Sequence, residues 1–252
     1  MPFTHYRTQG IFLKKEDRGE ADQLFTIFTK DYGKLEVLGR AIRKIKSKLR
    51  SGAELFYLSE IEFIQGKSYK TLTDAILIDK FKNLRGNHQK LGIAYKIADV
   101  LNSLAALEQN DEKIWQLVLA TFREIENWKI ENRKLEIIYY YFLWKLFDFL
   151  GYGPELYFCT ICGQKLLPET FWFLPKEGGI VCWRCFKKLS QEKKKEGKEV
   201  SVDSVKILRI FLQKDWDFVK KIKYPPESVK NLKDISEVYL QFLKEEFSKP
   251  EK

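Results

Sequence analysis

The sequence predicts an α+β protein of three parts: a small N-terminal β-barrel, a helical bundle domain and a cysteine-rich segment inserted into the helical domain. Three observations lead to this prediction. Strand-like runs fill about the first eighty residues, the apolar residues take a helical period from about residue 88, and all four cysteines fall in two close pairs. We expect the barrel over residues 1–80, the helical domain over 81–157 and 187–252, and the cysteine segment over 158–186.

Short runs rich in Thr, Ile, Phe, Tyr and Val indicate the barrel. Turn residues at Arg18-Gly19, Tyr32-Gly33 and Gly66-Lys67 separate them. The expected strands are 6–14, 23–30, 34–40, 55–64 and 69–78. Polar and apolar residues alternate in the fourth, as in a strand with one wet and one packed face. Short strands at this spacing fit an OB-fold, although an SH3-like barrel would look similar.

The helical period begins near residue 88 and continues in three segments. Their apolar residues are Leu91, Ala94, Tyr95, Ala98, Leu101 and Ala105, then Ile114, Leu117, Val118, Phe122 and Ile125, then Leu135, Ile138, Tyr139, Phe142, Leu143 and Leu146. Asn110-Asp111 supplies a cap between the first two. The third segment is apolar nearly all round, which predicts a place at the centre of a bundle. Residues 187–199 resemble a linker or helix end, and two further helices are expected over 203–213 and 227–248.

The four cysteines are the strongest single signal. Cys159 and Cys162 form one CxxC pair, Cys182 and Cys185 form the other, and residues 163–181 separate them. This spacing matches zinc sites in which two turns supply four sulfurs. Because every ligand position is a thiolate, no position is left for an activated water, and we expect a structural zinc ion (Zn²⁺). An iron–sulfur cluster, redox dithiols or four unliganded cysteines are the alternatives.

A stretch without acidic residues lies between the third and fourth expected strands. Its cations are Arg40, Arg43, Lys44, Lys46, Lys48 and Arg50. The apolar residues Ala41, Ile42, Ile45 and Leu49 are spaced so that a helix could dock on the barrel. Six uncompensated charges favour a polyanionic ligand and predict nucleic-acid binding, although a solvated loop is the plain alternative. Phe12, Phe25, Phe28, Tyr32 and Tyr57 are candidate stacking surfaces for bases, but most aromatics of a small barrel must fill its core.

The chain carries 45 Lys and Arg against 35 Asp and Glu, a formal net charge of +10, which attracts polyanions. The most apolar stretch, 137–150, is too short to cross a bilayer and contains two charges. The opening MPFTHYRTQG has no apolar leader region. We therefore expect a cytoplasmic protein without membrane association. No phosphate-binding loop or nucleophile–histidine arrangement occurs in the sequence, so we expect no enzyme activity.

Several motifs together resemble a known family. The runs from Thr8 to Lys14, Arg18 to Thr26 and Ala41 to Leu49, with Gly33-Lys34-Leu35, are similar to the opening of bacterial RecO proteins. So is Leu150-Gly151-Tyr152-x-Pro154-x-Leu156 leading into the first cysteine pair. The resemblance covers essentially the whole chain and implies an OB-fold, a helical domain and a zinc-binding loop region. Gly39-Arg40 and Ala53-Glu54-Leu55-Phe56 depart from the family pattern without removing a cation.

The resemblance also implies a function. RecO proteins are non-catalytic recombination mediators that bind single- and double-stranded DNA, anneal complementary strands and, with RecR, help to load RecA onto DNA coated by single-strand-binding protein. RecR and the C-terminal tail of single-strand-binding protein are then expected partners, in the bacterial cytoplasm and at the nucleoid during repair. Lys14, Lys15 and Lys34 join the candidate DNA contacts as secondary candidates. A partner-binding scaffold and an RNA-binding zinc-ribbon protein are the competing interpretations.

Overall fold

The computed structural model describes residues 4–66, 69–129 and 135–248. The chain divides into two compact units, Met1–Leu135 and Glu136–Lys252. In the parts of the chain that the structure describes, the first unit contains three α-helices and the second contains the others. Among the described residues, no helix has the length and apolar character needed to span a bilayer.

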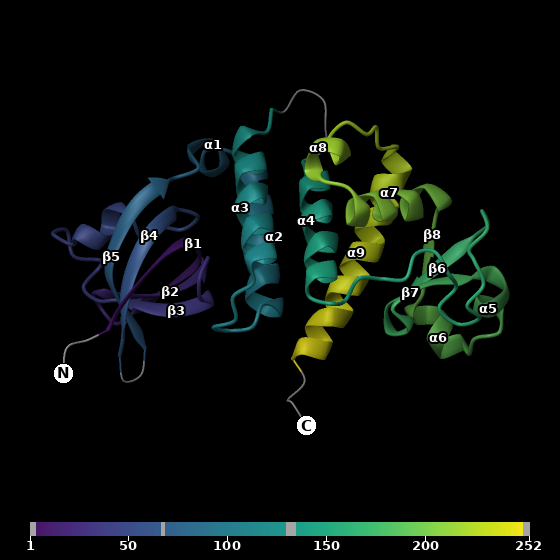
Figure 1. Ribbon diagram of the computed structural model, residues 1–252, viewed down its shortest axis with the longest axis horizontal. Coiled ribbons are helices and arrows are strands. Elements are labelled where there is room, and N and C mark those ends of the chain that lie inside the picture. Colours follow the sequence, from purple (N-terminus) through teal and green to yellow (C-terminus); the bar gives the residue numbers. More distant parts are fainter. Residues whose placement is uncertain (1–3, 67–68, 130–134, 249–252) are drawn as a thin grey trace. The chain divides into compact units, whose positions relative to one another are not determined.

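The first unit is built on a closed barrel of five strands, as predicted (Figure 1). They are β1 (His5–Arg18), β2 (Asp22–Thr29), β3 (Gly33–Gly39), β4 (Leu58–Gln65) and β5 (Lys70–Asp79). Their order around the barrel is β1-β2-β3-β5-β4, antiparallel except where β3 meets β5. The strand expected from residue 55 begins only at Leu58, and the turn expected at Gly66-Lys67 lies partly outside the described residues.

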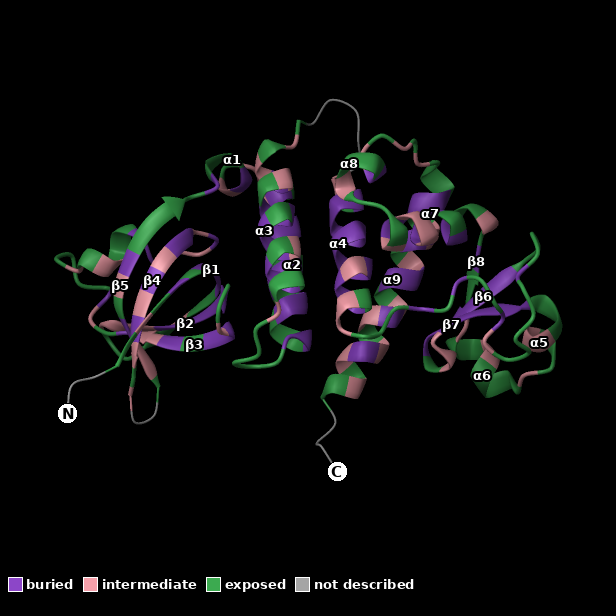
Figure 2. Cartoon of the chain, in the orientation of Figure 1, coloured by how far each residue is buried: buried purple, intermediate pink, exposed green. Residues whose placement is uncertain are grey.

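Apolar side chains from every strand fill the barrel. The buried set is Phe12, Phe25, Ile27, Leu35, Val37, Ile42, Ala53, Ile61, Phe63, Leu72 and Ala75. Figure 2 shows β2 and β3 mostly buried, whereas the C-terminal end of β5 is exposed. The barrel therefore has a conventional dry interior, and its aromatic residues largely serve that interior.

Three helices pack on the barrel within the first unit: α1 (Lys82–Arg85), α2 (His88–Leu104) and α3 (Glu112–Asn127). The Asp111 carboxylate accepts hydrogen bonds from the backbone N–H groups of Lys113 and Ile114, which confirms the predicted cap. Aromatic side chains join the barrel to α3, with ring centroids 6.4 Å apart for Phe28 and Trp115 and 5.9 Å for Phe56 and Phe122. This shared core explains why the helices belong to the barrel's unit.

The second unit is organised around α4 (Glu136–Phe149), which contacts α7 (Val202–Gln213) and α9 (Pro226–Phe247). Buried residues occur on all sides of α4, so its predicted central place is confirmed. The Trp144 indole N–H donates to Ser236 Oγ at 2.9 Å, and the Trp144 ring stacks on Tyr239 with centroids 5.5 Å apart. A short helix, α8 (Trp216–Val219), follows α7.

The cysteine segment adds a small sheet that the sequence did not predict. Its strands are β6 (Phe171–Leu174), β7 (Gly179–Cys182) and β8 (Lys198–Val200), in the order β7-β6-β8, with the 3₁₀ turn η2 (Pro175–Glu177) and the helices α5 (Trp183–Lys187) and α6 (Gln191–Glu196). Residues 187–199, expected as a linker or helix end, contain α6 and most of β8. The segment is thus completed beyond the expected end at residue 186.

Candidate metal centre and nucleic-acid interface

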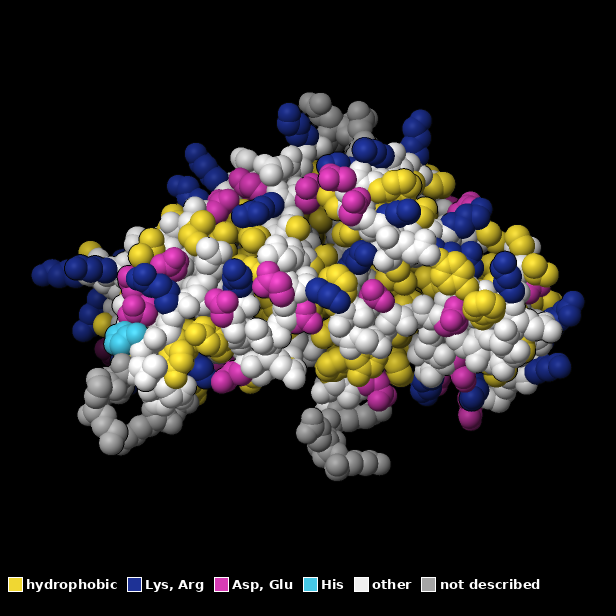
Figure 3. All heavy atoms as spheres, viewed as in Figure 1, with side chains coloured by type: hydrophobic (Ala, Val, Ile, Leu, Met, Phe, Trp, Pro, Cys, Tyr) yellow, Lys and Arg dark blue, Asp and Glu magenta, His cyan; other side chains and the backbone are white. Residues whose placement is uncertain are grey.

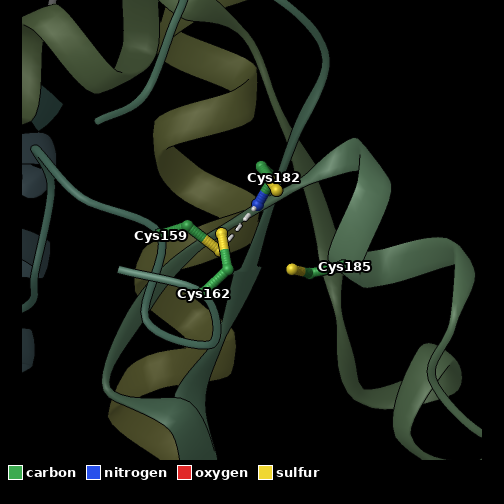
Figure 4. Close-up of side chains that lie close together, drawn as sticks. All are labelled: Cys159, Cys162, Cys182 and Cys185. Atoms are coloured by element: carbon green, nitrogen blue, oxygen red, sulfur yellow. Dashed lines mark hydrogen bonds between the residues drawn. The ribbon is translucent and has the colours of Figure 1, made fainter. Parts of the chain in front are cut away.

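The two cysteine pairs meet at one point of the second unit. Cys159 and Cys162 belong to a turn that precedes β6, Cys182 ends β7, and Cys185 lies in α5. The four Sγ atoms all lie within 4.8 Å of one another, around a common space (Figure 4). A tetrahedral zinc ion with bonds of about 2.3 Å places its sulfurs about 3.8 Å apart. The spacing therefore fits a four-sulfur metal site after a small contraction.

Backbone hydrogen bonds hold the first turn in shape. The N–H of Gly163 donates to the Cys159 carbonyl at 2.8 Å, and the N–H of Cys159 donates to the Gln164 carbonyl at 2.8 Å. Gly163 has a φ of +68°, a conformation that glycine adopts without a Cβ clash. The Thr160 N–H donates to the Ile180 carbonyl at 3.0 Å and so ties this turn to β7. Hydrogen bonds within residues 159–180 thus shape the first turn and bring it to β7.

The thiols differ in how readily they lose a proton. Burial raises the pKa of Cys159, but backbone N–H groups of Cys182, Cys162 and Ile161 outweigh that effect and lower it to about 7. Burial and hydrogen bonds with the other cysteines raise the pKa of Cys185 to about 12. Four adjacent thiols cannot all ionise without a compensating cation, because each thiolate repels the next. A divalent metal supplies that cation and makes all four sulfurs ligands.

Residues 40–50 are here called the basic segment. They form turns and then enter the 3₁₀ turn η1 (Lys48–Ser51). The apolar spacing would allow an α-helix over this stretch, but the backbone forms turns. Ala41 has a φ of +52°, and the Arg43 N–H donates to the Ala21 carbonyl at 3.0 Å, so the backbone is held to the β1–β2 turn instead of coiling. Ile42 is buried and Leu49 packs on the barrel core, but Ile45 is 91% exposed. Ile42 and Leu49 therefore pack on the barrel as expected, whereas Ile45 does not.

All six cations of the basic segment are exposed. Arg43 Nη1 lies 3.3 Å from Asp17 Oδ2. In the described parts of the chain, no acidic oxygen lies within 4.0 Å of the other five cations, which are Arg40, Lys44, Lys46, Lys48 and Arg50. Figure 3 shows Lys and Arg side chains projecting from this edge of the barrel, at the left of the view. The basic segment therefore presents five exposed cations that have no acidic partner among the described residues.

The secondary candidates have different surroundings, and the ammonium of Lys15 lies 2.5 Å from Glu54 Oε1. The ammonium of Lys14 lies 2.5 Å from Glu16 Oε1, and this contact lowers the pKa of Glu16. Lys34 is buried, and its Nζ donates to the Asn102 carbonyl in the last turn of α2 at 2.6 Å. Burial lowers the pKa of Lys34. Because its ammonium is enclosed and engaged by a helix end, we remove Lys34 from the candidate DNA contacts and correct its role to a helix cap.

The predicted aromatic stacking surfaces are mostly occupied by the fold. Phe12, Phe25 and Phe28 are buried, so they offer no face to a base. Tyr32 packs edge-on against Phe63, with ring centroids 5.5 Å apart. The Arg85 guanidinium lies 4.5 Å from the centroid of the Tyr57 ring, an arrangement that the sequence did not reveal.

Comparison with known proteins places this architecture in context. A family model described as "Recombination protein O N terminal" matches residues 1–81, and one described as "Recombination protein O C terminal" matches residues 85–249. A protein named DNA repair protein RecO from Dehalococcoides mccartyi is 31% identical over 240 residues, covering 95% of this chain and 91% of its own. The protein of that name from Alkaliphilus metalliredigens is 29% identical and covers 93% and 92%. A third, from Desulfitobacterium hafniense, is 26% identical and covers 94% and 84%.

Proposed function

The chain belongs to the RecO family of DNA repair proteins, and from this premise we propose that its basic segment binds single- and double-stranded DNA so that complementary strands anneal. One observation carries the proposal: five of the six cations have no acidic partner among the described residues. The exposed set, Arg40, Arg43, Lys44, Lys46, Lys48 and Arg50, is the proposed interface, with Lys14 at its margin.

Electrostatics explains how such a surface could promote annealing without nucleotide hydrolysis. Two DNA strands repel each other through their phosphates, whereas the base pairs that they form release free energy. Each phosphate neutralised by a lysine or arginine also releases condensed counterions. A protein that screens the phosphates and holds the strands together therefore accelerates a reaction that is already downhill.

The family membership also supports a place in a larger assembly. We propose that this protein, together with RecR, helps to load RecA onto single-stranded DNA coated by single-strand-binding protein, and that it contacts that protein's C-terminal tail. No catalytic step is required in this role, because the protein only exchanges binding partners.

The cysteine cluster supports a separate, structural role for a metal. We propose that Cys159, Cys162, Cys182 and Cys185 bind one zinc ion as thiolates. The ion would supply no reactive water there, since four protein sulfurs complete its tetrahedral shell. Its contribution is to hold the two turns of the segment together.

Annealing of complementary oligonucleotides without nucleotide tests the proposed function. The purified protein should accelerate pairing, and Arg43→Glu with Lys44→Glu should abolish the acceleration. Lys230→Glu with Lys233→Glu, two exposed positions on α9, changes the net charge equally and serves as the control, which should retain the acceleration. An unchanged rate in the Arg43/Lys44 variant would reject the assigned surface.

A further inference from the structure

One apolar side chain stands out at the centre of the basic segment. Ile45 is 91% exposed, the highest value of any large apolar side chain in the described residues. It occupies the tip of a turn in which the Ser47 N–H donates to the Lys44 carbonyl at 3.0 Å. Its neighbours in sequence, Lys44 and Lys46, are exposed as well.

The turn is anchored on both sides, so its tip has a defined place. Before the tip, Ile42 is buried in the barrel core and the Ala41 N–H donates to Asp22 Oδ1 at 2.7 Å. After it, Leu49 packs against the same core. The large apolar residues on either side, Ile42 and Leu49, are therefore packed, whereas Ile45 lies in solvent between cations.

This inference rests on the proposed function, and it deepens the function by naming the part of DNA that the tip contacts. We propose that Ile45 packs against the bases of single-stranded DNA while Lys44 and Lys46 contact the phosphates on either side. Single strands expose base faces that a paired and stacked duplex hides. Apolar side chains, including isoleucine, are known to pack against or between bases in nucleic-acid complexes.

The positive charge around Ile45 favours a partner that combines anionic and apolar groups. A protein surface complementary to this segment would need acidic groups around an apolar pocket. Single-stranded DNA combines anionic phosphates and apolar bases along its whole length. An anionic bilayer shares the same two features, and the experiment below separates it from DNA. Ile42 is buried and Leu49 packs on the barrel core, so Ile45 is the large apolar group that the basic segment offers to bases.

The test measures the affinity of the full-length protein for a single-stranded oligonucleotide over a series of salt concentrations. Ile45→Ala should weaken binding about fivefold at every salt concentration, because apolar contact area is lost. Ile45→Phe should strengthen it several-fold, and more for the single strand than for a duplex of the same sequence. Neither change should alter the salt slope, since isoleucine releases no counterions. Lys46→Ala should instead make the slope shallower by about 0.7.

A matched pair of variants at Leu107 controls for surface hydrophobicity. Leu107 is exposed in the same unit but lies beside Glu108, so Leu107→Ala and Leu107→Phe should leave DNA affinity unchanged. Equal affinities of wild type, Ile45→Ala and Ile45→Phe would overturn the inference. If Lys46→Ala still lowers the slope in that case, the proposed function survives without it. Stronger binding of Ile45→Phe to phosphatidylglycerol vesicles, with DNA affinity unchanged, would also overturn it and would assign the tip to a membrane surface.

Discussion

The two units use their charged and polar residues in different ways. The first unit exposes a cluster of six cations on the barrel surface, of which Arg43 alone has an acidic partner among the described residues, whereas the second gathers four thiols and a set of buried tyrosines. Both units also place lysines at helix ends. Lys34 and Lys90 donate to carbonyls of Asn102 and Glu126 in the first unit, and Lys145 donates to that of Leu212 in the second.

This comparison shows that net charge is a poor guide to where a polyanion binds. The ammonium group of each of those three lysines reaches the C-terminal turn of another element's helix (α2, α3 and α7), where carbonyls lack partners within the helix. Their ammonium groups donate to helix-end carbonyls and are largely withdrawn from the surface. The location of unpaired cations, more than their number in the sequence, identifies the candidate interface.

Removal of the metal should produce the largest difference between the units, because it should destabilise the second unit and spare the first. If zinc holds the cysteine segment together, Cys182→Ser with Cys185→Ser should destabilise the second unit by roughly 4 kcal/mol or more, as loss of a structural metal commonly does. The barrel's binding of DNA should persist, because its core contains no cysteine. Bound zinc, thermal unfolding and DNA affinity measured on one preparation check this. Full zinc content in the double variant would contradict the assignment.

Lys34→Ala tests the division between structural and surface cations. The change removes the charge-assisted hydrogen bond to Asn102 and leaves the end of α2 uncapped, so we expect a loss of about 1–3 kcal/mol in the first unit. The salt slope of DNA binding should stay at the wild-type value, measured where both proteins are folded. Lys46→Ala is the counterpart: it should lower the slope and leave the free energy of unfolding nearly unchanged. A reduced slope for Lys34→Ala would return that residue to the interface.

Alkaline titration should affect the two units in opposite directions. Burial raises the pKa of Tyr141 and Tyr239 to about 12, above their ordinary value near 10. Their contribution to stability is therefore complete below pH 10 and is lost as the pH rises toward 12. Burial lowers the pKa of Lys34 and Lys90, so the first unit gains stability as the pH rises toward 10.5.

Each tyrosine should contribute roughly 2 kcal/mol to this loss, and Lys145 in the same unit offsets part of it because burial also lowers its pKa. Tyrosine absorbance during unfolding follows the titration directly. Tyr141→Phe and Tyr239→Phe together should flatten the alkaline loss. Ionisation of both tyrosines near pH 10 in the folded protein would contradict it.

The sequence predicted the elements that have a long periodic pattern or that depend on contacts between residues close in the sequence. The barrel strands, the three central helices and the cap at Asp111 follow from periodicity and from side chains that bond nearby backbone. The cysteine cluster followed from spacing alone, because each CxxC turn fixes its own geometry. The strands β6, β7 and β8 have only three or four residues each, too few for a period to register.

Other features depended on contacts between distant residues. The helical spacing of Ala41, Ile42, Ile45 and Leu49 was overridden by hydrogen bonds to Ala21 and Asp22. Burial of Lys34 depends on α2, which follows it by more than fifty positions in the sequence. Assignment of the helices to two units depended on aromatic packing such as that of Phe56 on Phe122.

Salt titration of single-stranded DNA binding tests the central claim most directly. With about −0.7 in slope for each phosphate contacted, engagement of the whole basic segment predicts a slope of about −4 for the wild-type protein. Reversal of Arg43 and Lys44 to glutamate should make the slope much shallower, while the Lys230/Lys233 control should retain it. A flat salt response in the wild-type protein, or an equal slope in the reversed variant, would contradict the account.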